Sequence, residues 1–201
     1  MGGNFSALEE SDVYRGWVIR VAKGRFCDPD GNAFERDVVH HPGAVAVVPV
    51  DDAGNAILVS QFRAAAGGEV LEVPAGTCDV PGEARIVTAR RELQEEVGLL
   101  AGRIEELATV YNSPGILDQV TTVYLATELT RCERNVSGPE ERWMTIREVP
   151  LTTIDLLQRD SRAFDAVTLL GLNLARDVLN RRQSADVSAS DASARDLSQD
   201  R

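Results

Sequence analysis

The stretch that decides the fold is residues 76–99, which read GTCDVPGEARIVTARRELQEEVGL. Its first part carries a Pro-Gly pair and is typical of a loop. Its second part places apolar residues at helical spacing, namely Ile86, Ala89, Leu93 and Val97. We therefore predict a helix from about Glu83 to Val97, which Gly98 ends as a glycine just after a helix commonly does.

Three glutamates of this predicted helix share one face. Glu92, Glu95 and Glu96 are related by i, i+3 and i+4 spacing, while the apolar residues point the other way, into the core. An isolated acidic face is ordinarily just solvated. Here it stands in register with a Gly-rich loop, Arg91 and a helix stop. Since Mg²⁺ takes carboxylate oxygens together with substrate phosphates, the pattern favours a metal site.

This register resembles the Nudix box, Gly-x5-Glu-x7-Arg-Glu-apolar-x-Glu-Glu-x-Gly-apolar, the signature of Nudix hydrolases. The chain departs from it in one respect, because six residues rather than five separate Gly76 from Glu83. The extra residue falls in the loop ahead of the helix. The resemblance implies a fold of the α+β class: an α/β/α sandwich with a mixed sheet, preceded by an N-terminal antiparallel β region.

Segments around the box resemble ADP-ribose pyrophosphatases in particular. Residues 72–76 (EVPAG) resemble the segment that leads into their box, and residues 60–63 (SQFR) resemble a Gln-Tyr-Arg strand end. Residues 113–115 (SPG) lie about sixteen residues past the box, where a proline is associated with ADP-ribose preference. Residues 163–168 (AFDAVT) resemble the start of their C-terminal helix. Gln119 stands where the family often has glutamate, and this departure concerns one substrate or metal contact.

The resemblance implies a divalent cation, Mg²⁺ or alternatively Mn²⁺, held at the acidic face. The implied metal-binding residues are Ala75 (through its carbonyl), Glu83, Glu92, Glu95 and Glu96. Physically, carboxylates repel a diphosphate unless cations stand between them, and such cations polarise phosphoryl oxygens. Arg91 is expected to hold the glutamates in place through a salt bridge. Both Arg91 and Glu95 count among the catalytic candidates.

A downstream loop often supplies the general base in this subfamily. Residues 138–142 (GPEER) precede a predicted strand at Trp143, in the corresponding place. We favour Glu141 as the base, with Glu140 as a close rival. The alternative is that these residues form an ordinary exposed acidic turn. The geometry around a carboxylate decides whether it acts as a general base.

The substrate-binding candidates are Arg36, Arg63, Pro114 and Gly115. Guanidinium groups match phosphate oxygens in a bidentate manner, so the two arginines are candidates for diphosphate or terminal-ribose contacts, although surface salt bridges explain them equally well. Phe34 and Trp17 are candidates for stacking on adenine, but a buried core position is the favoured interpretation. His40 and His41 are adjacent on a predicted strand and face opposite ways, which argues against a shared metal.

Composition excludes several other classes of function. The chain has 201 residues, with 21 Lys and Arg against 32 Asp and Glu, hence a formal charge of −11, which disfavours binding to nucleic acid or anionic membranes. Neither a secretory leader nor a membrane-length apolar run is evident. The three cysteines are widely spaced and odd in number, which indicates reduced thiols and a cytoplasmic location.

The chain divides into three predicted parts. Residues 1–40 form an N-terminal β region, built as a hairpin around the turn at 28–32, which the resemblance implies takes part in a homodimer. Residues 41–183 form the Nudix domain, and the Ser/Asp/Ala-rich residues 184–201 are expected to be a disordered tail. Within the domain we predict strands at 43–50, 56–63, 69–73, 105–111, 120–127 and 143–149, and a second helix at 163–181.

The expected activity is metal-dependent hydrolysis of ADP-ribose, or a related nucleoside diphosphate sugar, to AMP and ribose 5-phosphate. Three alternatives stay open. One is another nucleotide sugar or dinucleotide as substrate, and a second is a non-catalytic domain that senses a nucleotide. The third is a purely structural acidic helix, which predicts no magnesium dependence.

Overall fold

The computed structural model describes residues 4–135, 141–159 and 164–196. The strands are β1 (Ser6–Arg15), β2 (Arg20–Cys27), β3 (Ala33–His40), β4 (Ala44–Pro49), β5 (Asn55–Arg63), β6 (Gly68–Glu72), β7 (Ala75–Thr77), β8 (Leu99–Tyr111), β9 (Val120–Arg131) and β10 (Thr145–Pro150). The helices are α1 (Arg85–Val97), the 3₁₀ turn η1 (Leu151–Thr153), α2 (Ile154–Arg159) and α3 (Ala166–Asp196).

The central sheet has the order β7-β4-β9-β8 and is mixed, because β4 runs parallel to β9 while the other pairs are antiparallel. Alternate residues of β4 enter two different cores. Val45 and Val47 pack with Leu93 of α1, whereas Ala46 and Val48 pack on the α3 side. A strand that is covered on both faces has a continuous run of apolar residues, as β4 does. The predicted α/β/α sandwich is confirmed.

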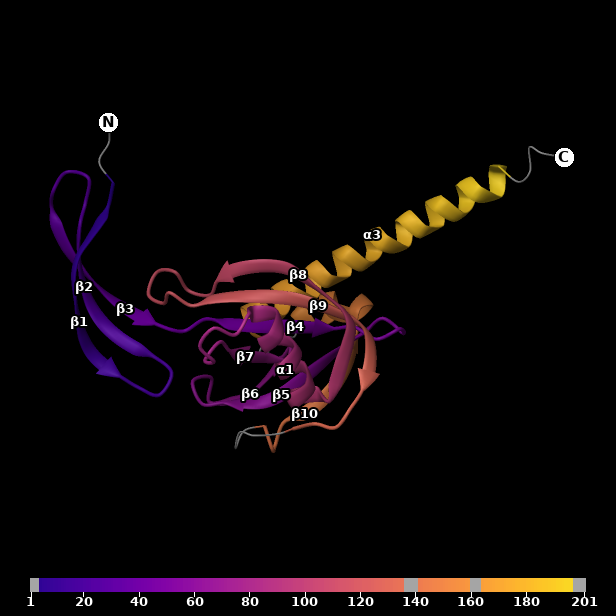
Figure 1. The fold of residues 1–201 in the computed structure, drawn as a ribbon, viewed down its shortest axis with the longest axis horizontal. Coiled ribbons are helices and arrows are strands. Elements are labelled where there is room, and N and C mark those ends of the chain that lie inside the picture. Colours follow the sequence, from indigo (N-terminus) through magenta and orange to yellow (C-terminus); the bar gives the residue numbers. More distant parts are fainter. Residues whose placement is uncertain (1–3, 136–140, 160–163, 197–201) are drawn as a thin grey trace.

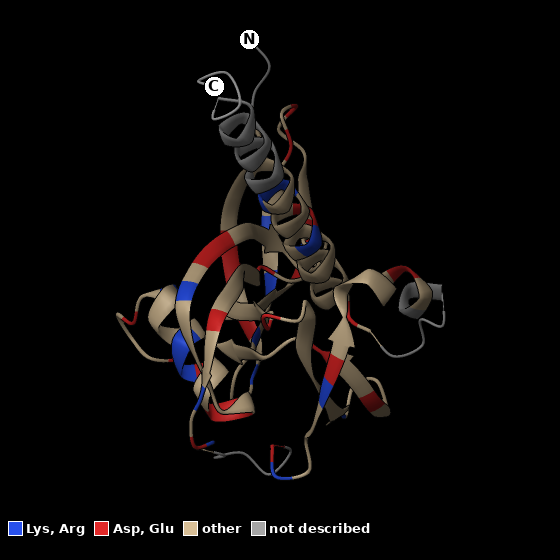
Figure 2. Ribbon diagram, turned by 90° about the vertical axis from the view of Figure 1, so that its right-hand side faces the viewer, with Lys and Arg blue, Asp and Glu red and all other residues tan. Residues whose placement is uncertain are grey.

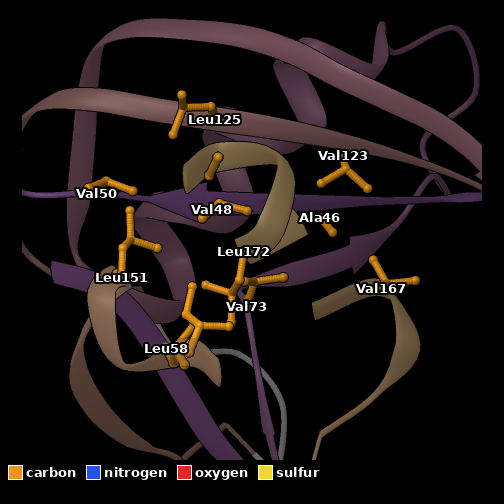
Figure 3. Close-up of a cluster of buried hydrophobic side chains, with 13 residues drawn as sticks. Ala46, Val48, Val50, Leu58, Val73, Val123, Leu125, Leu151, Val167 and Leu172 are labelled. Atoms are coloured by element: carbon orange, nitrogen blue, oxygen red, sulfur yellow. The ribbon is translucent and has the colours of Figure 1, made fainter. Parts of the chain in front are cut away.

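The core on the α3 side joins the two sheets of the main domain. Leu172 of α3 lies over Val48 and Val73, and Leu58 of β5 closes the cluster from below (Figure 3). The helix approaches the sheet closely at Gly171, where a Cβ atom would lie 2.9 Å from the Val48 side chain. Close approach of this kind needs a residue without a side chain.

A second sheet of the domain has the order β10-β5-β6. Its antiparallel register places Arg63 opposite Gly68 and Ser60 opposite Leu71. Leu71 also forms an isolated bridge with Phe164, just before α3. This sheet therefore fixes the end of β5, the segment that carries Arg63, relative to the helix behind it.

The N-terminal sheet has the order β1-β2-β3 and stands away from the rest of the molecule at one end (Figure 1). The predicted hairpin around residues 28–32 is present, but β1 adds a third strand from Ser6 to Arg15. Hydrophobic patterning could not reveal this strand, because every residue of β1 is exposed and its backbone pairing with β2 defines it. The sheet meets the domain where Val39 donates its N–H to the Ile116 carbonyl at 2.8 Å.

The C-terminal segment differs from the sequence-based expectation. Helix α3 continues to Asp196 and extends beyond the body of the protein (Figure 1), whereas residues 184–201 were expected to be disordered. The sequence after Gly171 contains neither glycine nor proline to end a helix, and alanine, the strongest helix former, recurs through it. Residues 197–201 lie outside the described residues.

Charged positions of both signs are spread over strands, helices and loops (Figure 2). In the described part of the chain, no helix is both long and apolar enough to cross a bilayer. All three cysteines are partly buried free thiols.

Candidate active site

A cavity of about 430 Å³ opens beside α1. Its walls come from the end of β5, from β7, from one face of α1 and from Glu141. It gathers seven of the predicted site residues, which are Arg63, Ala75, Arg91, Glu92, Glu95, Glu96 and Glu141. The helix residues that the pattern singled out therefore line one concave site.

Two carboxylates of α1 are buried at this cavity. Glu92 is 8% exposed and Glu96 is 4% exposed, and the Ala75 N–H donates to Glu96 Oε2 at 3.0 Å. Burial raises the pKa of Glu96 to about 8, against the opposing effect of that amide. It likewise raises the pKa of Glu92 to about 7, against the attraction of Arg91. Shifts of this size, in a concave site, are typical of functional carboxylates.

Arg91 lies among the acidic side chains and makes the predicted salt bridge. Its Nη1 donates to Glu92 Oε1 at 2.6 Å and to Glu95 Oε2 at 3.1 Å. Its Nη2 lies 3.4 Å from Glu83 Oε2, which also accepts the Thr88 hydroxyl at 2.7 Å. One guanidinium thus aligns three carboxylates that come from the helix and from the loop before it.

Gly76 leaves room for the Glu92 side chain. A Cβ atom at this position would lie 2.0 Å from Glu92 Cδ, far inside van der Waals contact. Strand β7 therefore approaches α1 so closely at Gly76 that only glycine fits. The loop that follows runs from β7 to α1. The inserted residue of the box lies in this loop, before α1 begins at Arg85, so it leaves the carboxylate register unchanged.

The donor set fits a hard divalent cation. Among the described residues, no group of three or more His, Cys, Asp and Glu side chains is gathered so that it could hold an ion. Arg91 forms ion pairs with Glu83, Glu92 and Glu95. The donors are nevertheless all oxygens, and Glu92, Glu95 and Glu96 line one cavity in which two of them are buried. Oxygen-rich, partly buried sites of this kind suit Mg²⁺ better than softer metals.

A buried carboxylate that the sequence did not single out holds Arg63. Glu72 Oε2 accepts Arg63 Nε at 2.8 Å and Gln61 Nε2 at 3.0 Å. Burial raises the pKa of Glu72, and the nearby Arg63 opposes that rise. Glu72 lies in the EVPAG segment that served only as a family marker. Buried polar residues on strands have no spacing signature that would distinguish them from core positions.

Glu141 lies at the same cavity, where its negative charge helps to raise the pKa of Glu92 and of Glu96. It is thus within electrostatic reach of both buried carboxylates. Its rival, Glu140, lies outside the described residues.

The other three substrate-binding candidates lie elsewhere. A second cavity, of about 400 Å³, is lined by Arg36 of the N-terminal sheet and by Pro114 and Gly115 of the loop between β8 and β9. It shares no lining residue with the first cavity. The four substrate-binding candidates are thus divided between two cavities, with Arg63 at the first and the other three at the second.

The aromatic candidates also separate. Phe34 is half-buried, stacks on Phe26 with ring centroids 5.7 Å apart, and has the Arg36 guanidinium 4.8 Å from its centroid. It lines the second cavity. Trp17 is fully exposed at the turn between β1 and β2, so the expectation of a buried core position is wrong for it.

Comparison with known proteins agrees with this geometry. The chain is 39% identical over 161 residues to an ADP-ribose pyrophosphatase of Bacillus subtilis (strain 168), covering 80% of this chain and 86% of that protein. It is 38% identical over 148 residues to an ADP-ribose pyrophosphatase of Mycobacterium tuberculosis, covering 74% and 72%. The crystal structure of an ADP compounds hydrolase superposes with a TM-score of 0.78 at 23% identity, covering 89% of this chain and 96% of that one.

The match to a family model covers most of the domain just described. Residues 40–166 match the model of the NUDIX domain, a span that includes the box, the first cavity and both sheets of the sandwich. Together with two relatives above 30% identity over most of the chain, this match settles the relationship. The protein belongs to the NUDIX domain family.

Proposed function

We propose that the protein hydrolyses the diphosphate linkage of ADP-ribose, or of a closely related nucleoside diphosphate sugar, to AMP and a sugar phosphate such as ribose 5-phosphate. The observation that carries this proposal is the pair of buried carboxylates, Glu92 and Glu96, facing a cavity that also presents Arg63. The relatives named as ADP-ribose pyrophosphatases support the choice of substrate.

The proposed cofactor is Mg²⁺, with Mn²⁺ as a substitute. Its proposed ligands are carboxylates of Glu83, Glu92, Glu95 and Glu96 and the carbonyl of Ala75. When bound, a divalent ion neutralises the diphosphate and lowers the pKa of bound water. Arg91 keeps the carboxylates aligned, as its contacts with Glu92 and Glu95 support.

The remaining chemistry falls to side chains around the cavity. Glu72 engages Arg63 through Nε, so that the terminal nitrogens of Arg63 can face a phosphate. Glu141 accepts a proton from the attacking water while the oxygen of that water forms a bond to one phosphorus. The bond from that phosphorus to the bridging oxygen then breaks, and the second phosphate leaves with the electron pair.

We assign the base of the nucleotide to the second cavity, where Phe34 and Arg36 face Pro114 and Gly115. We also propose that the protein is a homodimer joined through its N-terminal sheet. Large apolar side chains are exposed there, namely Phe5, Leu8, Val13, Tyr14 and Trp17. The two cavities of one chain share no lining residue, and we propose that this dimer brings the second cavity of one protomer beside the first cavity of its partner. The free thiols support a cytoplasmic location.

The test is a hydrolysis panel with the purified protein. ADP-ribose, UDP- and GDP-sugars and dinucleotides are assayed with Mg²⁺, with Mn²⁺ and with chelator, and phosphate-containing products are separated by chromatography. We expect ADP-ribose to give AMP only when a divalent ion is present. Comparable turnover of UDP- or GDP-sugars would remove the ADP-ribose assignment. Nucleotide binding without any turnover would instead identify a sensing domain.

Glu96→Gln provides the matched variant for this panel. It keeps the size of the side chain and an oxygen acceptor for the Ala75 amide, but it removes the charge that an ion needs. We expect turnover to fall by about 100-fold or more, since loss of a residue that merely supports a metal ligand already costs roughly 10- to 100-fold. An unchanged rate in a folded Glu96→Gln protein would refute the site.

A further inference from the structure

His40 bridges two carboxylates at the place where the N-terminal sheet meets the domain. Its Nδ1 lies 2.6 Å from Asp118 Oδ2, and its Nε2 lies 2.9 Å from Glu10 Oε2. One side chain at the end of β3 therefore contacts both the first strand of the sheet and the loop between β8 and β9. None of the catalytic roles proposed above uses it.

The same loop is tied to β3 through the backbone. Val39 donates its N–H to the Ile116 carbonyl at 2.8 Å, and the Asp118 N–H donates to the Val39 carbonyl at 3.0 Å. The other carboxylate oxygen of Asp118 accepts the His41 N–H at 2.8 Å. Asp118 thus anchors the loop through its backbone N–H and through both of its carboxylate oxygens. His40 contacts one of these two oxygens.

This loop forms one wall of the second cavity. Pro114, Gly115 and Ile116 face Phe34 and Arg36, which belong to β3. The width of the cavity therefore depends on how firmly the loop is held against the end of that strand.

We propose that His40 is a positioning residue for nucleobase binding: by joining Asp118 and Glu10 it holds the loop of residues 112–119 against the N-terminal sheet and so sets the affinity of the second cavity for the base. This inference rests on the assignment of the base to that cavity. His40 does not touch the ligand, and it acts through the loop.

The charges around His40 make this contact dependent on pH. Both ring nitrogens can donate only in the imidazolium form. Burial alone lowers the pKa of His40, but the hydrogen bonds with Glu10 and Asp118 outweigh it and the pKa is raised. Arg20, from β2, opposes the charge on His40 while pairing with Glu10 at 2.6 Å.

The neighbouring histidine has the opposite character. Burial lowers the pKa of His41, with Asp118 opposing, and its Nδ1 accepts the Gly43 N–H at 3.0 Å, which suits a neutral ring. Because the pKa of His40 is raised in the folded protein, its interaction with the two carboxylates is complete below the ordinary pKa of 6.5. The interaction is lost as the pH rises through the raised pKa, so the contact made by His40 should weaken over that range.

The experiment measures adenosine binding to the full-length protein by calorimetry at pH 6 and pH 9. Adenosine is suitable because its base keeps one protonation state over this range and it carries no phosphate. We expect the wild-type protein to bind it about tenfold more tightly at pH 6 than at pH 9, a ratio typical of the loss of one supporting contact. His40→Gln should bind with the weaker affinity at both pH values. In hydrolysis it should raise KM for ADP-ribose and leave kcat unchanged.

Two further variants sharpen the test. Asp118→Asn removes the charge that faces His40 but keeps an oxygen for the His41 amide, so it should mimic His40→Gln, and the double variant should be no worse than either. Glu35→Gln is the matched control. Glu35 lies on the same strand as His40, but its carboxylate pairs with Lys23 and not with the loop. It should bind adenosine like the wild type.

The outcomes separate the inference from its premise. If the wild-type protein binds no adenosine while hydrolysing ADP-ribose, the base is not in the second cavity and the inference falls with that assignment, whereas the hydrolase proposal stands. If His40→Gln retains tight, pH-dependent binding, His40 has no positioning role. Circular dichroism checks the fold, and Asp118→Asn replaces His40→Gln in the same comparison if the latter fails to fold.

Discussion

Gly76 is the position where one added atom should do most damage. Its missing side chain gives Glu92 its place, because a Cβ atom would lie 2.0 Å from Glu92 Cδ. Gly76→Ala must push Glu92 away from its contact with Arg91. We expect activity to fall about 100-fold, as a misplacement near 1 Å can cause. The overpacking should lower the free energy of unfolding by about 1–3 kcal/mol.

Activity assays and urea unfolding measure the two effects of Gly76→Ala. Gly68→Ala is the control, since no atom lies within 4 Å of its added Cβ. Equal activity of the two alanine variants would show that Glu92 is not constrained by strand β7.

Glu72 is the residue that should control how Arg63 meets the substrate. Glu72→Gln keeps the shape but removes the charge that the Arg63 Nε engages at 2.8 Å. We expect KM for ADP-ribose to rise by roughly 10- to 100-fold, the usual range for a residue that orients a binding group, with a smaller change in kcat. Steady-state kinetics at saturating Mg²⁺ measure both constants.

The control for Glu72 is Glu69→Gln on the same strand, where the exposed carboxylate accepts the Ser60 hydroxyl and not Arg63. If both variants raised KM equally, the effect would belong to the strand and not to Arg63.

For single residues, the sequence predicted the helical spacing of the glutamates better than the burial of their side chains. The i, i+3 and i+4 pattern predicted that Glu92, Glu95 and Glu96 share one face of the helix, which helix geometry alone determines, and all three line one cavity. It could not predict that Glu92 and Glu96 are buried. Nor could it identify Glu72, since the burial of a strand residue depends on segments far away in the chain.

Among the elements, α3 packs closely against the central sheet at Gly171. At Gly171 a Cβ atom would lie 2.9 Å from a Val48 methyl group and 3.1 Å from a Val123 methyl group. Gly171→Ala gains about 1 kcal/mol of helix propensity and incurs about 1–3 kcal/mol of overpacking. We therefore expect a net loss of stability of up to ~2 kcal/mol by urea unfolding, with little change in activity.

Asn180→Ala serves as the control in the same helix, because Asn180 is exposed and its substitution should change stability by no more than about 0.5 kcal/mol. A stabilised Gly171→Ala protein would mean that α3 can move away from the sheet at no cost.

Elements with a strong apolar pattern were predicted well, and elements held by other forces were not. The buried strand at 43–50 and the helix at 83–97 correspond to β4 and α1 within two residues at each end. Strand β1 depends on backbone pairing, and the last part of α3 depends on alanine content without a helix-ending residue. Neither produces a hydrophobic period that a sequence could display.

For the whole molecule, the exposed turn between β1 and β2 should decide the oligomeric state. Trp17 is fully exposed there, beside Tyr14 and Val18. If the sheet joins two copies, Trp17→Ser should shift the protein toward the monomer in sedimentation velocity at low micromolar concentration. Loss of a large aromatic residue from an interface commonly costs more than 2 kcal/mol, roughly a 30-fold weaker association.

Trp143→Ser is the matched control, because Trp143 is also strongly exposed but precedes β10 in the Nudix domain. It should leave the sedimentation profile unchanged. A wild-type protein that sediments as a monomer at every concentration would remove the homodimer from the account.

Arg91 has a consequence for how the protein behaves when divalent ions are scarce. Its guanidinium supplies positive charge to Glu83, Glu92 and Glu95 without any ion. Mutual repulsion of these acids is therefore already relieved in the resting chain, unlike in small zinc domains that stay unfolded until metal arrives. The supply of divalent ion should consequently govern the turnover rate of the enzyme. The amount of folded protein in the cell should stay the same when that supply falls.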